Sequence, residues 1–112
     1  MKIFLVFQKE DEKYDSLPKD AEVIPLFKYI KGNPNIDYIK ARCQEILDTA
    51  NVKTDFIVFN GPSYLCALAG YIWFTQEGRT LMNFYSFNKQ TQVYCPHTNL
   101  LDIEDTKEFT HG

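Results

Sequence analysis

The stretch of sequence that decides the fold is Phe56-Ile57-Val58-Phe59-Asn60-Gly61-Pro62-Ser63. Its first four residues are aromatic or β-branched, which favours a buried strand, expected over Asp55–Phe59. Gly61 and Pro62 then end the strand, and Pro62 suits the first position of a helix, where its missing N–H costs nothing. The next residues, to about Gln76, are apolar at nearly every position. The stretch therefore predicts a strand, a tight turn and a helix that is buried on every side.

The rest of the chain predicts further strands and one amphipathic helix. Pro25 indicates that the second strand lies at an edge of the sheet or ends at this residue, and Asn35 is the expected N-cap of the amphipathic helix. The predicted strands are 3–7, 21–26, 80–87 and 91–95, and the amphipathic helix runs from residue 36 to about residue 50. This order indicates an α/β domain over residues 1–96, with a mostly parallel sheet, flanking helices and a C-terminal β-hairpin. Residues 97–112 are expected to form a loosely ordered acidic tail.

Composition narrows the classes of function. The chain has 112 residues, of which 45% are hydrophobic and 24% charged, as in a single globular domain. Its net charge is −3, without clusters of Lys and Arg, so duplex nucleic acid is not expected as a partner. A domain of this size can hardly bury the apolar helix on all sides, so we expect a homodimer in which this helix meets a second copy.

Disulfides, metal sites, cofactors and membrane segments are not expected in this chain. Cys43, Cys66 and Cys95 are widely spaced and odd in number, which argues against a disulfide framework or a zinc site. No metal-binding pattern is present, and no cofactor is expected. The apolar N-terminal run is too short for a signal peptide, and no run reaches membrane-spanning length. We therefore expect a cytoplasmic protein without a membrane partner.

The turn after the strand 55–59 is the main candidate site. Ligands of open α/β sheets bind beyond the carboxyl ends of the strands. The backbone N–H groups of Ser63 and Tyr64 would face an anion there, Asn60 and Ser63 would add side-chain donors, and Gly61 and Pro62 would let the backbone approach closely. The alternative is that these residues simply cap and start a helix.

Two other strand ends supply further candidates. Gln8 and Lys9 follow the first strand on the same edge, where they could contact a base and a phosphate, unless they merely begin a solvated loop. Tyr85 and Phe87 end the fourth strand and could stack on a nucleobase. For Tyr85, packing across the hairpin is the alternative.

Signatures of an enzyme are weak in this sequence. His97 and His111 have no Asp or Cys at a persuasive spacing. Any catalysis would be metal-free and would hold a phosphodiester so that its own ribose 2′-hydroxyl attacks in line. No catalytic residue is assigned, and Ser63, Lys9 and Lys89 are the candidates.

The closing half of the sequence resembles a known group of proteins. The residues that carry this likeness are 56–63, Ala67-Leu68-Ala69-Gly70, Met82-Asn83-Phe84-Tyr85 and Gln92-Val93-Tyr94. They are similar to the closing half of SAVED domains, which with CARF domains are Rossmann-like sensors of cyclic oligonucleotides in bacterial antiviral defence. The opening run 1–7 and the small size resemble the CRISPR-associated ring nucleases, dimers of one CARF-like domain that cleave cyclic oligoadenylate.

This resemblance implies a Rossmann-like homodimer that binds, and could cleave, a cyclic oligoadenylate in defence of the type III CRISPR kind. The ligand would lie between the strand-end residues of two subunits. The acidic run Glu10-Asp11-Glu12 and the lack of a matched catalytic Lys or Arg favour binding over cleavage. Two alternatives stay open: a protein-interaction module that pairs through the apolar helix and the edge strand, and a metal-dependent nucleotide enzyme of another family.

Overall fold

The fold is built on one five-stranded sheet with the strand order β2-β1-β3-β4-β5. The computed structural model describes residues 1–10, 12–28, 35–76 and 81–98. The first four strands are parallel, and β5 runs antiparallel to β4. Their bounds are Lys2–Phe7 for β1, Glu22–Phe27 for β2, Phe56–Val58 for β3, Phe84–Asn88 for β4 and Val93–His97 for β5. The predicted α/β domain with a mostly parallel sheet is confirmed.

Strand β1 lies inside the sheet and is covered on both faces. Ile3, Phe4, Leu5 and Val6 have no exposed surface. Because successive side chains of a strand point to opposite faces, Phe4 and Val6 pack with the helices, whereas Ile3 and Leu5 join a second apolar cluster on the other face. A continuous apolar run is the pattern that such a two-sided strand requires.

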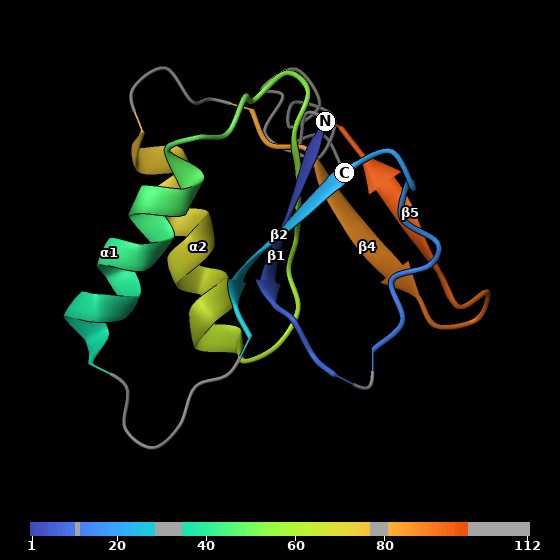
Figure 1. The fold of residues 1–112 in the computed structure, drawn as a ribbon, viewed down its shortest axis with the longest axis horizontal. Helices are drawn as coiled ribbons and strands as arrows, with labels where there is room; N and C mark the ends of the chain where they lie inside the picture. Colours follow the sequence, from blue (N-terminus) through green and yellow to red (C-terminus); the bar gives the residue numbers. More distant parts are fainter. Residues whose placement is uncertain (11, 29–34, 77–80, 99–112) are drawn as a thin grey trace, which may run out of the picture.

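Both helices cover the same face of the sheet (Figure 1). Helix α1 is Ile36–Leu47 and connects β2 to β3, and helix α2 is Ser63–Thr75 and connects β3 to β4. Both connections step along the sheet in the same direction, so right-handed crossovers place them on one side. The step from β1 to β2 goes the opposite way. The described parts of the connecting segment, residues 8–10 and 12–21, lie on the opposite face, where Leu17 packs against Ile3 and Leu5.

The ends of several elements differ from the sequence-based expectation. Strand β4 begins at Phe84, later than expected, because the Leu81 carbonyl accepts a hydrogen bond from Trp73 Nε1 at 2.8 Å instead of joining a strand ladder. Residue 80, the predicted start, lies outside the described residues. Pro62 is the N-cap of α2 and not its first helical residue. Strand β5 runs two residues further than expected, to His97, a residue that the sequence pattern assigns to the tail. Residues 99–112 of the predicted tail lie outside the described residues.

Helix α2 is only partly covered by its own chain. Leu65, Ala69, Ile72 and Trp73 are buried against the sheet and α1. On the outer side of the helix, Tyr64 is 48% exposed and Tyr71 is 63% exposed, so the helix is not buried on every side within one copy. Among the described residues, no helix is both long enough and apolar enough to cross a membrane.

Candidate functional site

The candidate site lies where the carboxyl ends of β1 and β3 meet. These two strands are neighbours and parallel, so both end at the same edge of the sheet. Beyond this edge the chain leaves β1 across one face and leaves β3 into α2 on the other face. Diverging connections of this kind open a crevice outside the strand ends, and this is where ligands of open α/β sheets bind.

Asn60 fixes the geometry of this strand end. Its side-chain oxygen accepts a hydrogen bond from the backbone N–H of Phe7 at 3.1 Å, and its Nδ2 donates to the Phe7 carbonyl at 2.5 Å. The amide thus replaces a strand residue, and it continues the pairing of β1 and β3 past Val58. The predicted ligand-binding side chain is therefore engaged with the protein.

Gly61 brings the turn against β1. Its φ is +85°, a conformation that residues with a side chain rarely adopt. A Cβ added at this position would lie 2.4 Å from Phe7 Cβ, so the turn and the end of β1 have no room for a side chain. The backbone of the turn makes the expected close approach, but it approaches Phe7 of the same chain.

The N-terminus of α2 presents unpaired donors at the same edge. Pro62 caps the helix without a side-chain hydrogen bond, and its carbonyl accepts from the N–H groups of Leu65 and Cys66 at 3.1 and 3.3 Å. In the described part of the chain, no acceptor pairs with the backbone N–H of Ser63 or of Tyr64. Unpaired N–H groups of a first helical turn attract anions.

Glu12 is the centre of a hydrogen-bond network that sequence reasoning missed. Its Oε1 accepts from the Tyr94 hydroxyl at 2.5 Å, and its Oε2 accepts from the Tyr14 hydroxyl at 3.0 Å and from Asn60 Nδ2 at 3.2 Å. The Tyr14 hydroxyl in turn accepts from the backbone N–H of Lys9 at 3.2 Å. The network ties residues 12–14 to the turn after β3 and to β5.

The network perturbs the pKa of each of its acids. Burial alone would raise the pKa of Glu12, but the hydrogen bonds that the carboxylate accepts outweigh it and lower this pKa below the ordinary value of 4.5. Burial, followed by the hydrogen bond to this carboxylate, raises the pKa of Tyr94, and burial is also the main cause that raises the pKa of Tyr14. At neutral pH the network is therefore one carboxylate held by two neutral phenols.

A cavity of about 320 Å³ opens at this edge, within the size range of small-molecule pockets. We name it the lysine cavity, because Lys9 and Lys28, which follow β1 and β2, both line it. The positive charge of Lys9 lowers the pKa of the Cys66 thiol in the first turn of α2. Burial has the larger effect, so the pKa of this thiol is raised. The remaining lining residues are Gln8, Glu10, Glu12 and Tyr14.

A second cavity, of about 500 Å³, lies on the other side of Glu12. It is lined by Glu12, Lys13, Phe87 and Gln92, and we name it the Phe87 cavity. The ring of Phe87 is 39% exposed and meets the ring of Tyr94 edge-on, with 5.0 Å between the centroids. Phe87, a predicted stacking residue, therefore has an accessible face next to the network.

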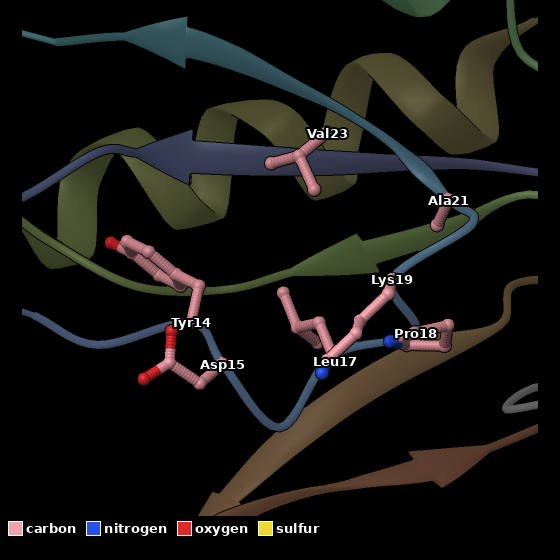
Figure 2. A pocket seen from close by; sticks show the side chains of 7 residues that line it. All are labelled: Tyr14, Asp15, Leu17, Pro18, Lys19, Ala21 and Val23. Atoms are coloured by element: carbon pink, nitrogen blue, oxygen red, sulfur yellow. The ribbon is translucent and has the colours of Figure 1, made fainter.

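A third cavity, of about 550 Å³, lies away from the strand ends on the face of the sheet opposite to the helices. Figure 2 shows its lining side chains along the segment 8–21 and at the start of β2, with α2 behind the sheet. The lining residues are Tyr14, Asp15, Leu17, Pro18, Lys19, Ala21 and Val23. None of them was predicted as a site residue.

The predicted site residues fall into three places. Gln8 and Lys9 line the lysine cavity, and Asn60 to Tyr64 form the adjoining turn and helix start. Tyr85 instead lies in the core, 8% exposed, with its ring centroid 4.8 Å from that of Phe56. Lys89 is exposed in the connection between β4 and β5.

Sequence reasoning missed Lys28, Glu12, Tyr14 and Tyr94. Lys28 follows β2 as Lys9 follows β1, so the strand-end rule could have found it. The path of the chain between β1 and β2 decides where Glu12 and Tyr14 lie and brings them to Tyr94 of β5. No local spacing encodes that path.

His97 has a partner that its position in the sequence did not suggest. Its Nε2 lies 2.7 Å from Ser86 Oγ, and its ring stacks on Phe84 with 4.6 Å between the centroids. Both polar side chains are exposed. Within the described residues no carboxylate contacts the other ring nitrogen to complete a triad, so this pair offers little support for nucleophilic catalysis.

The described residues contain no group of three or more His, Cys, Asp or Glu side chains that could hold a metal ion. Comparison with protein-family models, with curated proteins and with solved structures finds no match to this chain. The functional conclusion therefore depends on the geometry of the strand ends.

Proposed function

We propose that this chain binds a cyclic oligonucleotide at the carboxyl edge of its sheet, as a cytoplasmic homodimer of Rossmann-like domains in bacterial antiviral defence of the type III CRISPR kind. One observation carries the proposal. The lysine cavity, with Lys9 and Lys28 in its wall, lies at the same edge of the sheet as the N-terminus of α2, where Ser63 and Tyr64 keep unpaired N–H groups.

The hydrogen-bond donors at this edge support a phosphorylated ligand rather than a neutral one. Two ammonium groups and two backbone donors are suited to phosphate oxygens. Two carboxylates, Glu10 and Glu12, also line the cavity. The carboxylate of Glu12 keeps its charge and is engaged by the hydrogen bonds that it accepts, so the phosphate contacts are assigned to the lysines and the backbone donors. The net charge of −3 does not oppose this site, because a small ligand responds to the local groups.

The topology supports the Rossmann-like part of the proposal. The strand order β2-β1-β3-β4-β5 matches one of the common doubly wound orders, in which the switch point lies between the first and third strands. Here β5 is antiparallel and both helices cover one face, so the match is in strand order alone. The lysine cavity and the turn 60–63 both lie beside this switch point.

The exposed side of α2 supports the homodimer. Tyr64 and Tyr71 stand two turns apart on a helix without charged residues, and both are largely exposed in one copy. A second copy packed on this side would cover them. Because Tyr64 also belongs to the helix start at the site, such a dimer would bring two sites close together.

Cleavage of the bound ligand is a separate part of the proposal. Ser63 and Lys9 are exposed at the site, and Lys89 lies in the connection after β4. None of the three has a base at hydrogen-bonding distance among the described residues. Any cleavage would depend on positioning of the ribose 2′-hydroxyl rather than on general-base catalysis.

The experiment is a ligand panel on the purified chain. Cyclic di-, tri-, tetra- and hexa-adenylates are added one at a time, with inorganic phosphate as the reference anion, and the thermal midpoint is recorded. The proposal predicts a rise in the midpoint with one or more of the cyclic ligands. The same mixtures, with and without EDTA, are then analysed for linear products, which would add metal-free cleavage. If none of the cyclic ligands raises the thermal midpoint, the proposal is contradicted.

A second candidate function is a protein-interaction module. The observation that favours it is Tyr71, 63% exposed on an apolar helix and not part of the lining of the lysine cavity. This hypothesis predicts a stable complex with another protein that Tyr71→Arg abolishes and Asn60→Ala leaves intact. The ligand-binding proposal predicts no such complex and a thermal response to the cyclic ligands.

A further inference from the structure

Glu12 stands between two cavities of comparable size. It lines the lysine cavity, of about 320 Å³, together with Lys9 and Lys28. It also lines the Phe87 cavity, of about 500 Å³, together with Phe87. Each volume alone is in the range that holds a small ligand, and the side chain of Glu12 is the lining that the two cavities share.

Aromatic side chains form a continuous row from one cavity to the other. Tyr14 lines the lysine cavity and stacks on Tyr94 with 6.1 Å between the ring centroids. Tyr94 in turn meets Phe87, which lines the second cavity. The hydroxyls of both tyrosines donate to the Glu12 carboxylate, at 3.0 and 2.5 Å, and so fasten it between the cavities.

We infer that the lysine cavity and the Phe87 cavity are two halves of one groove for an oligonucleotide, and that Glu12 is the latch that divides them. A ligand of one nucleotide occupies the lysine cavity with the latch closed. A ligand of several nucleotides displaces the Glu12 carboxylate from Tyr94 and occupies both halves. This inference rests on the proposed function and adds to it a preference set by ligand length.

The chemistry of the two halves fits successive parts of such a ligand. In the lysine cavity, Lys9 and Lys28, beside Glu10, offer cations for a phosphate. In the Phe87 cavity, the exposed face of Phe87 offers a stacking surface for a base, and Lys13 is a further cation. A phosphodiester that runs between them must pass the Glu12 carboxylate, which repels it. The latch therefore opposes long ligands specifically. Their apparent affinity equals the affinity of the open form multiplied by the fraction of molecules in which the latch is open.

Tyr94→Phe tests the latch because it deletes one hydroxyl and keeps the ring. Isothermal titration compares adenosine monophosphate with linear and cyclic tetra-adenylate on wild type and variant. We expect about tenfold tighter binding of the tetranucleotides, since a hydrogen bond to a charged group is lost from the closed form. Binding of the monophosphate should stay within about twofold. Tyr38→Phe, on the exposed side of α1, is the matched control and should change neither.

Phe87→Leu provides a second test at an exposed position that does not threaten folding. It should weaken the tetranucleotides and leave the monophosphate unchanged, because only the long ligands reach this half of the groove. Unchanged tetranucleotide affinity in Tyr94→Phe, or equal effects on short and long ligands in either variant, would overturn the inference and leave the proposed function standing. If the wild type binds none of these ligands, both are overturned.

Discussion

The side-chain amide of Asn60 pairs with both backbone groups of Phe7, donating to the carbonyl at 2.5 Å and accepting from the N–H at 3.1 Å. Asn60, a predicted ligand-binding residue, thus also acts as a clasp: its side chain joins the turn before α2 to the end of β1 by two hydrogen bonds. Through Nδ2 it reaches Glu12 as well, at 3.2 Å. The turn therefore joins the scaffold of the sheet to the network that borders the proposed groove.

Asn60→Asp should destabilise the domain. The substitution keeps the shape but replaces the Nδ2 donor by an oxygen that faces the Phe7 carbonyl and the Glu12 carboxylate. We expect a loss of about 2 kcal/mol in the free energy of unfolding, measured by urea denaturation. Asn35→Asp is the matched control, because an aspartate caps α1 as well as the asparagine does. Equal stability of the two variants would contradict the role of Asn60 as a clasp.

Gly61→Ala and Gly70→Ala should change stability in opposite directions. At Gly61 the added Cβ meets Phe7 Cβ at 2.4 Å and the backbone has a φ of +85°, so a loss of about 2 kcal/mol or more is expected. At Gly70, inside α2, the added Cβ has its nearest contact at 3.9 Å, with Phe59. The better helix propensity of alanine should then raise stability by up to about 1 kcal/mol. Thermal midpoints of the two variants provide the comparison.

The Glu12 network should make stability depend on pH in the acid range. The pKa of Glu12 is lower in the folded chain than its ordinary value of 4.5, so the unfolded chain binds the proton more tightly. The contribution of the network is therefore complete above about pH 4.5 and is lost as the pH falls through the folded pKa. Urea midpoints between pH 2.5 and pH 7, chosen to bracket about 4.5, should fall more steeply on acidification in wild type than in Tyr94→Phe.

The tyrosines of the network give the opposite dependence at alkaline pH. The pKa values of Tyr94 and Tyr14 are raised above the ordinary value of 10.0, so the folded chain holds these protons more tightly than the unfolded one. Stability should fall as the pH rises above about 10, and Tyr94→Phe should reduce this fall. An identical alkaline profile in wild type and variant would show that the Tyr94 hydroxyl does not contact the carboxylate in solution.

The proposed homodimer should depend on the exposed side of α2. Tyr71→Arg places a charge on an apolar helix where the tyrosine is 63% exposed, and it should shift the sedimentation coefficient from dimer to monomer. Tyr38→Arg makes the same change on α1, where the tyrosine is 61% exposed, and should leave the dimer intact. A wild type that sediments as a monomer at all concentrations would contradict the dimer directly.

Residue type and periodicity along the chain predicted the strands and their positions in the sheet. The unbroken apolar run of β1 predicted a strand covered on both faces. Pro25 predicted an edge strand or a strand end, and the structure places β2 at an edge. The rule that parallel strands end at one edge then correctly placed Lys9 and Asn60 at the same edge of the sheet. These inferences need only periodicity, residue type and chain direction.

The remaining features depend on contacts between distant parts of the sequence. Tyr94 and Glu12 are 82 residues apart, and their hydrogen bond exists because the segment 8–21 crosses the helix-free face. The start of β4 was placed too early because Leu81 bonds to the Trp73 indole. Asn83, which alternates like a strand residue, uses its side chain to bond the Val52 carbonyl. Such partners cannot be read from spacing along the chain.

The most direct measurement of the central claim is a calorimetric titration of the chain with cyclic tetra-adenylate, repeated with Lys9→Ala/Lys28→Ala and with Lys53→Ala. Lys9 and Lys28 line the cavity at the carboxyl edge, whereas Lys53 is exposed before the start of β3, at the opposite edge. The account predicts that the double variant loses at least about tenfold in affinity, and that added salt weakens wild-type binding more than that of the double variant. Equal affinity of the two lysine variants, or no binding by the wild type, would contradict it.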